Sequence, residues 1–193
     1  MVRCCVMCVA ILLAGGCATR GPVRMPTGAW SGKGTFSYER WAAGEPAASI
    51  HRDYQTCICI KPAQVDDRPA FDIEIVSERG ELPEGLGPRT HLRLTLVEVK
   101  RPCESIAQYR VAGRFNPKPE ERPEFEGDTP PIGATCMRVD DLTVLQIVYE
   151  EGFSDVLRFR GRGLMKAGSL SDEDGVIHWA ESLVQTRPVD RLR

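Results

Sequence analysis

The sequence lacks the short motifs that mark several common enzyme classes. It contains no Gly-x-Ser-x-Gly element, phosphate-binding loop or dinucleotide fingerprint. Beyond Cys17 it has no Cys-x-x-Cys pair of the kind used by dithiol oxidoreductases or zinc knuckles. His51, His91 and His178 are scattered, without the spacing of metal ligands. No metal site or cofactor is therefore expected, and binding or structural roles come before an enzymatic one.

A dominant charge and a long apolar run are also missing. The chain has 25 Lys and Arg against 27 Asp and Glu, a formal net charge of −2, so nothing indicates a nucleic-acid partner. No segment after the first residues approaches the roughly 18 continuous apolar residues of a membrane-spanning helix. A chain of 193 residues suits one folded domain with a single core.

The amino terminus carries an export signal. Arg3 precedes an apolar run over residues 4–14, which is too short to span a bilayer and has the length of a signal-peptide core. The run ends in Leu13-Ala14-Gly15-Gly16-Cys17, which resembles the lipobox of bacterial lipoproteins. The commonest lipobox has leucine three places before the cysteine, where this chain has Ala14. An ordinary secretory signal and a cytosolic start are the alternatives.

The lipoprotein resemblance implies cleavage before Cys17 and acylation of that residue, palmitate included. Several acyl chains would hold the protein on membrane lipid in the bacterial cell envelope. Ala18 after the lipidated cysteine goes, in that family, with the outer membrane, facing the periplasm. The domains expected are a signal peptide at 1–16, a lipidated N-terminus and flexible tether at 17–27, and a β-rich domain at 28–193.

The remaining chain alternates apolar and polar residues with the period of two that is typical of strands. In the first segment Trp30, Gly32, Gly34, Phe36 and Tyr38 share one face. The segments expected as strands are 28–38, 49–61, 71–75, 92–100, 108–115, a hairpin in 136–149, and 156–165, while 176–185 suits strand or helix with strand preferred. Short connections favour antiparallel neighbours, so we expect a mainly β fold, an antiparallel barrel or sandwich of about 8–9 strands with little helix.

Two connections stand out for their composition. Residues 61–69 are expected to form a polar loop. Residues 116–131 hold five prolines and five acidic residues and cannot join a sheet interior, so they form a long acidic, Pro-rich loop. That loop is either a solvated excursion or an arm that docks an envelope protein.

Gly28-x-Trp30-x-Gly32-x-Gly34 resembles the first strand of calycin-type barrels, the group that includes lipocalins, fatty-acid-binding proteins, avidins and nitrobindin-like proteins. The resemblance implies that Trp30 plugs one end of a barrel whose apolar interior takes a small hydrophobic ligand. The chain departs from the lipocalin pattern because Asp53-Tyr54 follows Trp30 too soon and no closing arginine is distinct. Otherwise Trp30 is an ordinary core residue.

Four cysteines remain beyond Cys17, namely Cys57, Cys59, Cys103 and Cys136. Export places them in an oxidising compartment, so we expect disulfides, with Cys57 and Cys59 each pairing to Cys103 or Cys136. A four-thiolate zinc site is the alternative.

Arg158, Arg160 and Arg162 are expected to form a row on one face of 156–165, opposite Leu157 and Phe159. That row is a solvated sheet face or a grip on an anionic group. With Trp30, Arg158 and Arg160 are the candidates for ligand contact. The leading hypothesis is a membrane-anchored, non-enzymatic lipoprotein that binds a hydrophobic or amphiphilic small molecule. An envelope structural or interaction module is the alternative, and an enzyme comes third.

Overall fold

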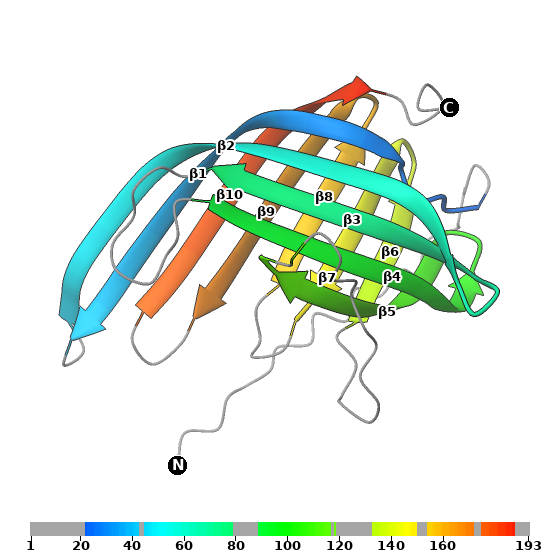
Figure 1. Ribbon diagram of the computed structural model, residues 1–193, viewed down its shortest axis with the longest axis horizontal. Coiled ribbons are helices and arrows are strands. Elements are labelled where there is room, and N and C mark those ends of the chain that lie inside the picture. The colour runs from blue at the N-terminus through cyan, green and yellow to red at the C-terminus, as the bar shows by residue number, and fades with distance from the viewer. Residues whose placement is uncertain are drawn as a thin grey trace, which may run out of the picture.

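The computed structural model describes residues 22–42, 45–78, 89–116, 118, 133–149, 154–171 and 175–187 (Figure 1). These residues contain no helix, and hence no helix long and apolar enough to cross a membrane. Their ten strands are β1 (Gly28–Ala42), β2 (Glu45–Val65), β3 (Arg68–Glu78), β4 (Arg89–Cys103), β5 (Ile106–Phe115), β6 (Gly133–Val139), β7 (Leu142–Val148), β8 (Ser154–Arg160), β9 (Gly163–Ser171) and β10 (Gly175–Arg187).

The strands close into one antiparallel barrel. Each strand pairs with its neighbour in the sequence, and β1 pairs with β10 to complete the ring. The predicted antiparallel barrel is thus confirmed and the sandwich alternative is excluded. Segment 176–185, which also suited a helix, lies in strand β10.

The strand count exceeds the expected 8–9 because one turn was missed. The segment expected as one strand, 156–165, turns at Gly161 and Arg162, so it contributes to both β8 and β9. Gly161 has φ +56°, a left-handed conformation that glycine adopts without strain. The expected single-strand row of three arginines is therefore wrong for Arg162, which lies in the turn.

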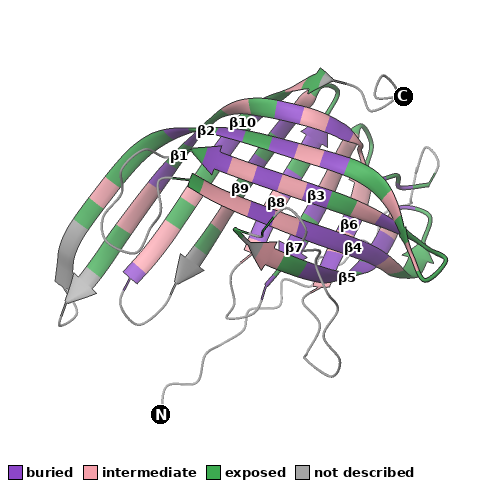
Figure 2. Ribbon diagram, in the orientation of Figure 1, coloured by how far each residue is buried: buried purple, intermediate pink, exposed green. Residues whose placement is uncertain are grey.

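Alternation decides which residues fill the barrel. Ile73 and Ile75 on β3 point inward and are buried, as are Ile58 and Ile60 on β2. Figure 2 shows the resulting alternation of buried and exposed residues along the strands. The buried apolar cluster runs from Trp30 through the inner faces of β2 to β10, with Leu157, Leu164 and Leu183 on the far side.

The two ends of the barrel differ in their connections. At one end, called the closed end here, the turns 66–67, 104–105, 140–141 and 161–162 each have two residues. The expected loop at 61–69 is thereby corrected, because β2 continues to Val65 and Asp66 and Asp67 make the turn with φ of 49° and 61°. Two positive φ values match the twist of a tight hairpin.

The N-terminal segment 22–27 packs on the closed end. Val23 and Met25 are buried in the core cluster. The Val23 amide donates to the Glu104 carbonyl at 2.6 Å, and Arg101 Nη1 donates to the Val23 carbonyl at 3.1 Å. The expected flexible tether is therefore wrong for residues 22–27, because their apolar side chains have a core to enter. Residues 17–21 lie outside the described part of the chain.

At the other end, called the open end, four strands continue past the rest of the barrel. β1 and β2 stay paired to Ala42 and Glu45, whereas the pairing of β2 with β3 is described only as far as Gln55 and Glu78. β10 follows β1 to Arg40, and β9 follows β10 to Ser171. Figure 1 shows this four-stranded extension projecting from the barrel. Most of the predicted loop 116–131 connects β5 to β6 at this end and lies outside the described residues.

Candidate functional site

A layer of charged and polar side chains crosses the barrel interior toward the open end. Strand pairing places its members: Lys166 on β9 is opposite Glu181 on β10, which is opposite Gly34 on β1, which is opposite Tyr54 on β2. Two residues further along β9, Gly168 is opposite Asp155 on β8. The polar layer consists of Tyr54, Thr56, Ser77, Tyr149, Asp155, Lys166, Trp179 and Glu181.

Lys166 bridges the two carboxylates of the layer. Its Nζ lies 3.0 Å from Glu181 Oε1 and 3.5 Å from Asp155 Oδ1. The side chains of Lys166, Asp155 and Glu181 are 7%, 3% and 0% exposed. Lys166 Nζ also lies 5.7 Å from the centre of the Trp179 ring, within the range of a cation–π contact. One ammonium group thus holds two buried carboxylates.

Each carboxylate has two further donors. Glu181 accepts hydrogen bonds from the Tyr54 hydroxyl at 2.6 Å and from Thr56 Oγ1 at 3.4 Å. Asp155 accepts from Trp179 Nε1 at 2.6 Å and from the Tyr149 hydroxyl at 3.0 Å. Buried charges are stable only when paired and hydrogen-bonded, so these donors are what allow the layer to exist.

Burial changes the acidity of the layer. Desolvation raises the pKa of Tyr149 well above its usual value, and the neighbouring Asp155 carboxylate raises it further. The hydroxyl therefore stays protonated and serves as a donor. Two acidic groups against one basic group give the layer an excess of negative charge.

Two glycines in the wall make room for the layer. A Cβ on Gly34 would lie 2.6 Å from Tyr54 Cζ and 2.8 Å from Glu181 Cγ. A Cβ on Gly168 would collide with the Trp179 ring and with the Ser154 carbonyl. Absence of a side chain at these positions lets the tyrosine and tryptophan lie against the strand backbone.

Beyond the layer, the inner face of the extension is mostly apolar, with Arg52 opposite Phe36 as a charged member. Tyr38 is opposite Ile50 on β2 and Ile177 on β10, and Phe36 is opposite Trp179. Tyr38, Ile50 and Ile177 are half-buried, whereas Phe36 is 2% exposed. An aromatic and aliphatic wall therefore stands directly above a polar floor, the mixture that is typical of small-molecule sites.

Sequence reasoning missed the polar layer, although a signal for it exists. Lys166 lies two residues after inward Leu164, and Glu181 lies two residues before inward Leu183. Charged residues at inward positions of strands are rare unless they are paired, so their alternation with leucine could have marked them.

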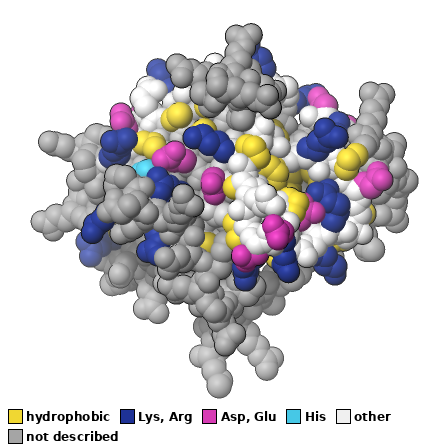
Figure 3. Space-filling view, turned by 45° about the vertical axis from the view of Figure 1, so that its right-hand side comes forward, with side chains coloured by type: hydrophobic (Ala, Val, Ile, Leu, Met, Phe, Trp, Pro, Cys, Tyr) yellow, Lys and Arg dark blue, Asp and Glu magenta, His cyan; other side chains and the backbone are white. Residues whose placement is uncertain are grey.

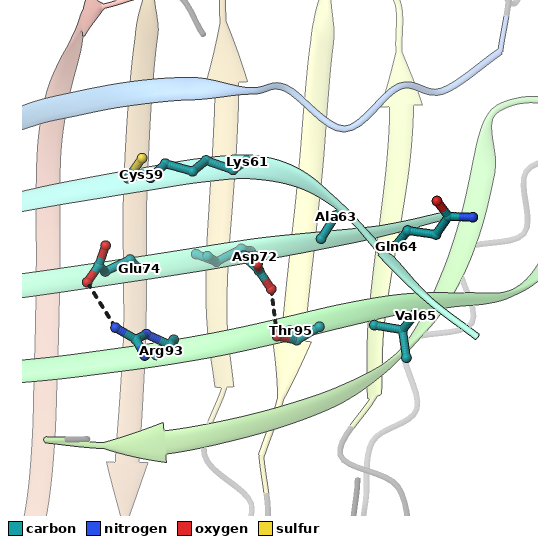
Figure 4. Close-up of a pocket in the computed structure, with 10 residues that line it drawn as sticks. Cys59, Lys61, Ala63, Gln64, Val65, Asp72, Glu74, Arg93 and Thr95 are labelled. Atoms are coloured by element: carbon teal, nitrogen blue, oxygen red, sulfur yellow. Dashed lines mark hydrogen bonds and ion pairs between the residues drawn. The ribbon is translucent and has the colours of Figure 1, made fainter. Parts of the chain in front are cut away.

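Two concave regions also lie on the outer wall. The first, of about 410 Å³, lies over β2, β3 and β4 (Figure 4). Its ionic contacts are internal, since Glu74 lies 3.9 Å from Arg93 and 2.7 Å from His91, and Thr95 donates to Asp72 at 2.7 Å. Charges of both signs compensate one another there.

The second outer region has about 470 Å³ and crosses β5, β6 and β7. Small residues on β6 form its floor, with Gly133 and Thr135 between the longer side chains of its neighbours. Val99 and Val148 line it and are about half exposed.

The expected disulfides are not formed, and strand geometry explains why. Cys57 and Cys59 are unpaired on the outer face of β2, and Cys136 is unpaired and buried inside the barrel. The wall itself separates Cys136 from the β2 pair. Cys103 is unpaired and exposed at the end of β4. No group of three or more potential metal ligands occurs among the described residues.

The four thiols have different environments. Burial raises the pKa of the Cys136 thiol to about 12. Burial also raises the pKa of Cys57 and Cys59, with Glu74 adding to it. In contrast, the Ser105 hydroxyl, 3.3 Å from Cys103 Sγ, lowers the pKa of that exposed thiol.

The structure does not bring the other candidate residues together. Trp30 is 2% exposed inside the closed end, with its ring centre 5.4 Å from that of Phe159. Arg158 and Arg160 are exposed on the outer face of β8, as the solvated-face interpretation expects. Cys17 lies outside the described residues.

Comparison with known proteins gives the fold alone. No protein-family model and no curated protein matches the sequence. Among solved structures, the barrel is similar to the S-type phycobiliprotein lyase CPES from Guillardia theta, with a TM-score of 0.51 and 10% identity. The match covers 84% of this chain and 89% of the lyase. The barrel fold of this chain is thus similar to that of a solved protein.

Proposed function

We propose that the open end of the barrel binds a small hydrophobic or amphiphilic molecule. The observation that carries this proposal is the polar layer under an apolar wall. Buried charges are costly, and a barrel needing only a core would fill its interior with apolar groups. Apolar walls with a few fixed polar groups are how small-molecule sites orient their ligands.

The closed half of the barrel has no room for a ligand, which supports a site at the open end. Its interior is occupied by the apolar cluster around Ile58, Leu145 and Leu183, which are no more than 2% exposed. A ligand therefore belongs above the polar layer, against Tyr38, Ile50 and Ile177. The likeness to a barrel described as a phycobiliprotein lyase supports, at the level of fold, a role in handling a small molecule.

Native mass spectrometry of the chain from residue 17 onward, purified from the periplasm, tests the proposal. We expect a co-purifying small molecule, or uptake of an added apolar dye such as anilinonaphthalene sulfonate. Replacing Tyr38 and Ile177 by serine should weaken dye binding at least about tenfold, because burial of one large apolar side chain contributes about 1.5–3 kcal/mol. The matched control is Val99→Ser on the outer wall. Equal loss in the control would contradict a site at the open end.

The protein is further proposed to be a lipoprotein of the bacterial envelope, anchored by acylated Cys17 to the outer membrane and facing the periplasm. Packing of Val23 on the closed end adds a geometric consequence. The six residues from Cys17 to Val23 reach at most about 20–22 Å. The closed end would then lie within that distance of the membrane surface. Labelled palmitate should enter the wild-type protein and not a Cys17→Ser variant; labelling of the variant would contradict the anchor.

An envelope interaction module is the second candidate. The groove across β5, β6 and β7 favours it, because exposed Val99 and Val148 line a trough on the outer wall. Crosslinking of the anchored protein in cells separates the two functions. A crosslinked envelope protein at residue 148, together with no ligand in the native mass spectrum, would favour the module.

A further inference from the structure

The outer face formed by β7, β8, β9, β10 and β1 is nearly free of carboxylates. Among the described outward-facing residues of these strands, Glu39 is the one acidic side chain, and it lies at the rim of the open end. The basic side chains there, Lys33, Arg158 and Arg160, lie toward the closed end, with Arg162 in the adjoining turn.

Aliphatic side chains alternate with these basic ones across the strands. In one row, Arg158 lies between Val144 on β7 and Met165 on β9. In the next row, Arg160 lies between Leu142 and Gly163, and Val184 follows on β10. The basic–aliphatic face also includes Val139 at the end of the adjoining strand β6. It is defined by Lys33, Val139, Leu142, Val144, Arg158, Arg160, Arg162, Met165 and Val184.

Three apolar members of this face are well exposed, whereas Leu142 and Val144 are half-buried. Met165 is 61%, Val184 59% and Val139 57% exposed. Arg160 does meet one carboxylate, Asp141 in the neighbouring turn, at 2.8 Å. Both side chains of that pair are largely exposed, at 76% and 65%, and pairs of this kind contribute little. They can therefore exchange partners without a large penalty.

The opposite wall is built differently. Basic side chains there meet carboxylates on the next strand, as Arg93 meets Glu74, or in the same strand, as Arg101 meets Glu98. The surface drawn in Figure 3 shows such interspersed blue and magenta side chains. The β7–β10 and β1 side thus differs in its outward-facing residues, whose basic side chains have few carboxylates beside them.

We propose that the basic–aliphatic face lies on a bilayer that contains anionic phospholipids. Arginine forks bind phosphate oxygens in pairs, and exposed aliphatic side chains enter the boundary between headgroups and acyl chains. Basic residues near such a surface each strengthen binding by about fivefold. The face is part of the convex barrel wall, which can touch a planar headgroup layer over several strands at once.

The N-terminal segment does not select this face. It crosses the closed end from Thr27, whose carbonyl accepts a hydrogen bond from Gln185 Nε2 on β10, to Val23 beside the β4–β5 turn. The proposed anchor at Cys17 would therefore tie the closed end to the membrane, and contact of the basic–aliphatic face with lipid does not require acyl chains.

Vesicle flotation tests the face without the anchor. The protein used is the chain from residue 17 with Cys17→Ser, since every described residue lies after that point. We expect it to float with phosphatidylcholine vesicles containing about a third phosphatidylglycerol, not with phosphatidylcholine alone, and to be released by high salt. Equal binding to both vesicles, or to neither, would overturn the proposal whatever palmitate labelling shows for Cys17.

Two matched pairs of substitutions locate the contact. Arg158→Glu with Arg160→Glu should reduce binding at least about 25-fold. Arg68→Glu with Arg89→Glu, two exposed positions on the other wall, should leave it unchanged. As a readout that needs no substitution, Met165 in the unaltered chain should be shielded from hydroxyl-radical oxidation by anionic vesicles. Lipid would be overturned as the partner if the Arg158 and Arg160 variant still bound vesicles, or if vesicles left Met165 unshielded. Retention of the protein on poly-glutamate without vesicle binding would also overturn lipid, and would favour an acidic protein instead.

Discussion

The two halves of the barrel interior are stabilised by different physics. In the closed half, side chains such as Leu145 and Leu157 exclude water completely, and stability there comes from apolar burial. In the open half, Lys166 and its two carboxylates are equally inaccessible, yet they depend on each other for charge and hydrogen bonds. An apolar half tolerates loss of one member by partial collapse, whereas a charged layer loses its balance when a single member is removed.

Removing the central cation should have the largest effect. Lys166→Met leaves Asp155 and Glu181 buried without their shared partner, so we expect the free energy of unfolding to fall by about 3–5 kcal/mol. Chemical denaturation measures the loss. A triple variant that adds Asp155→Asn and Glu181→Gln should recover much of it, because no unpaired charge remains. A loss below about 1 kcal/mol for the single variant would show that the two buried carboxylates do not depend on the Lys166 ammonium group.

A cavity in the closed half should cost somewhat less. Leu145→Ala removes a side chain that is 0% exposed, and such truncations lower the free energy of unfolding by about 2–5 kcal/mol. Dye binding at the open end should persist, because the polar layer separates Leu145 from the ligand wall. Loss of dye binding in a variant that remains folded would contradict the proposed division of the interior.

Filling the gap at a wall glycine should have an intermediate effect. The added methyl group of Gly34→Ala would collide with the Tyr54 ring and with Glu181 Cγ. We therefore expect the free energy of unfolding to fall by about 1–3 kcal/mol. Gly163→Ala is the matched control, since its nearest neighbour would lie at an ordinary 3.4 Å. Thermal unfolding followed by circular dichroism compares the two variants. Equal unfolding temperatures for Gly34→Ala and Gly163→Ala would mean that the polar layer rearranges to accommodate the added methyl group.

Modification of the exposed thiols should have the smallest effect on stability. The rates at which the four cysteines react should differ sharply between the surface and the barrel interior. Since thiolate is the reactive form, the lowered pKa of Cys103 predicts that iodoacetamide modifies it first near neutral pH. Cys57 and Cys59, whose pKa is raised, should follow, and Cys136 should react only after unfolding. Peptide mass spectrometry at several times gives the order. Early modification of Cys136 would contradict the conclusion that the closed half of the barrel excludes water and reagent.

Burial of Cys136 also predicts a pH dependence. Its folded pKa of about 12 lies above the ordinary value of 9.0, so the folded state holds this proton more tightly than the unfolded state does. The associated stability is complete below pH 9 and is lost as pH rises toward 12. Cys136→Ala should weaken this dependence in urea titrations between those limits; an unchanged slope would contradict it.

The barrel could be predicted from the sequence because apolar alternation recurs in nearly every strand. The missed strand shows the limit of that signal. Leu157 and Phe159 keep their period of two up to the turn, and Leu164 resumes an apolar pattern soon after it, so Gly161 and Arg162 alone had to mark the reversal.

The site was less predictable for a related reason. Alternation says that residue 166 points inward, but which charged side chains meet across the barrel depends on registers between β8, β9 and β10. The cysteine prediction went wrong on the same point. Ile58 and Ile60 already placed Cys57 and Cys59 on the outer face, and only the course of β6 places Cys136 inside.

Pairing of β1 with β10 has a consequence for the order in which the chain acquires its structure. Every other pair joins consecutive strands, so those hairpins can form while the chain is still emerging. The ring closes only when Trp30 meets Gln185, near the two extremes of the described chain. Such a remote contact forms slowly, and until then β1 and β10 present unpaired edges. Glu181 lies on β10, so it meets Lys166 in the β9–β10 hairpin but receives the hydrogen bond from the Tyr54 hydroxyl on β2 only at the closing step.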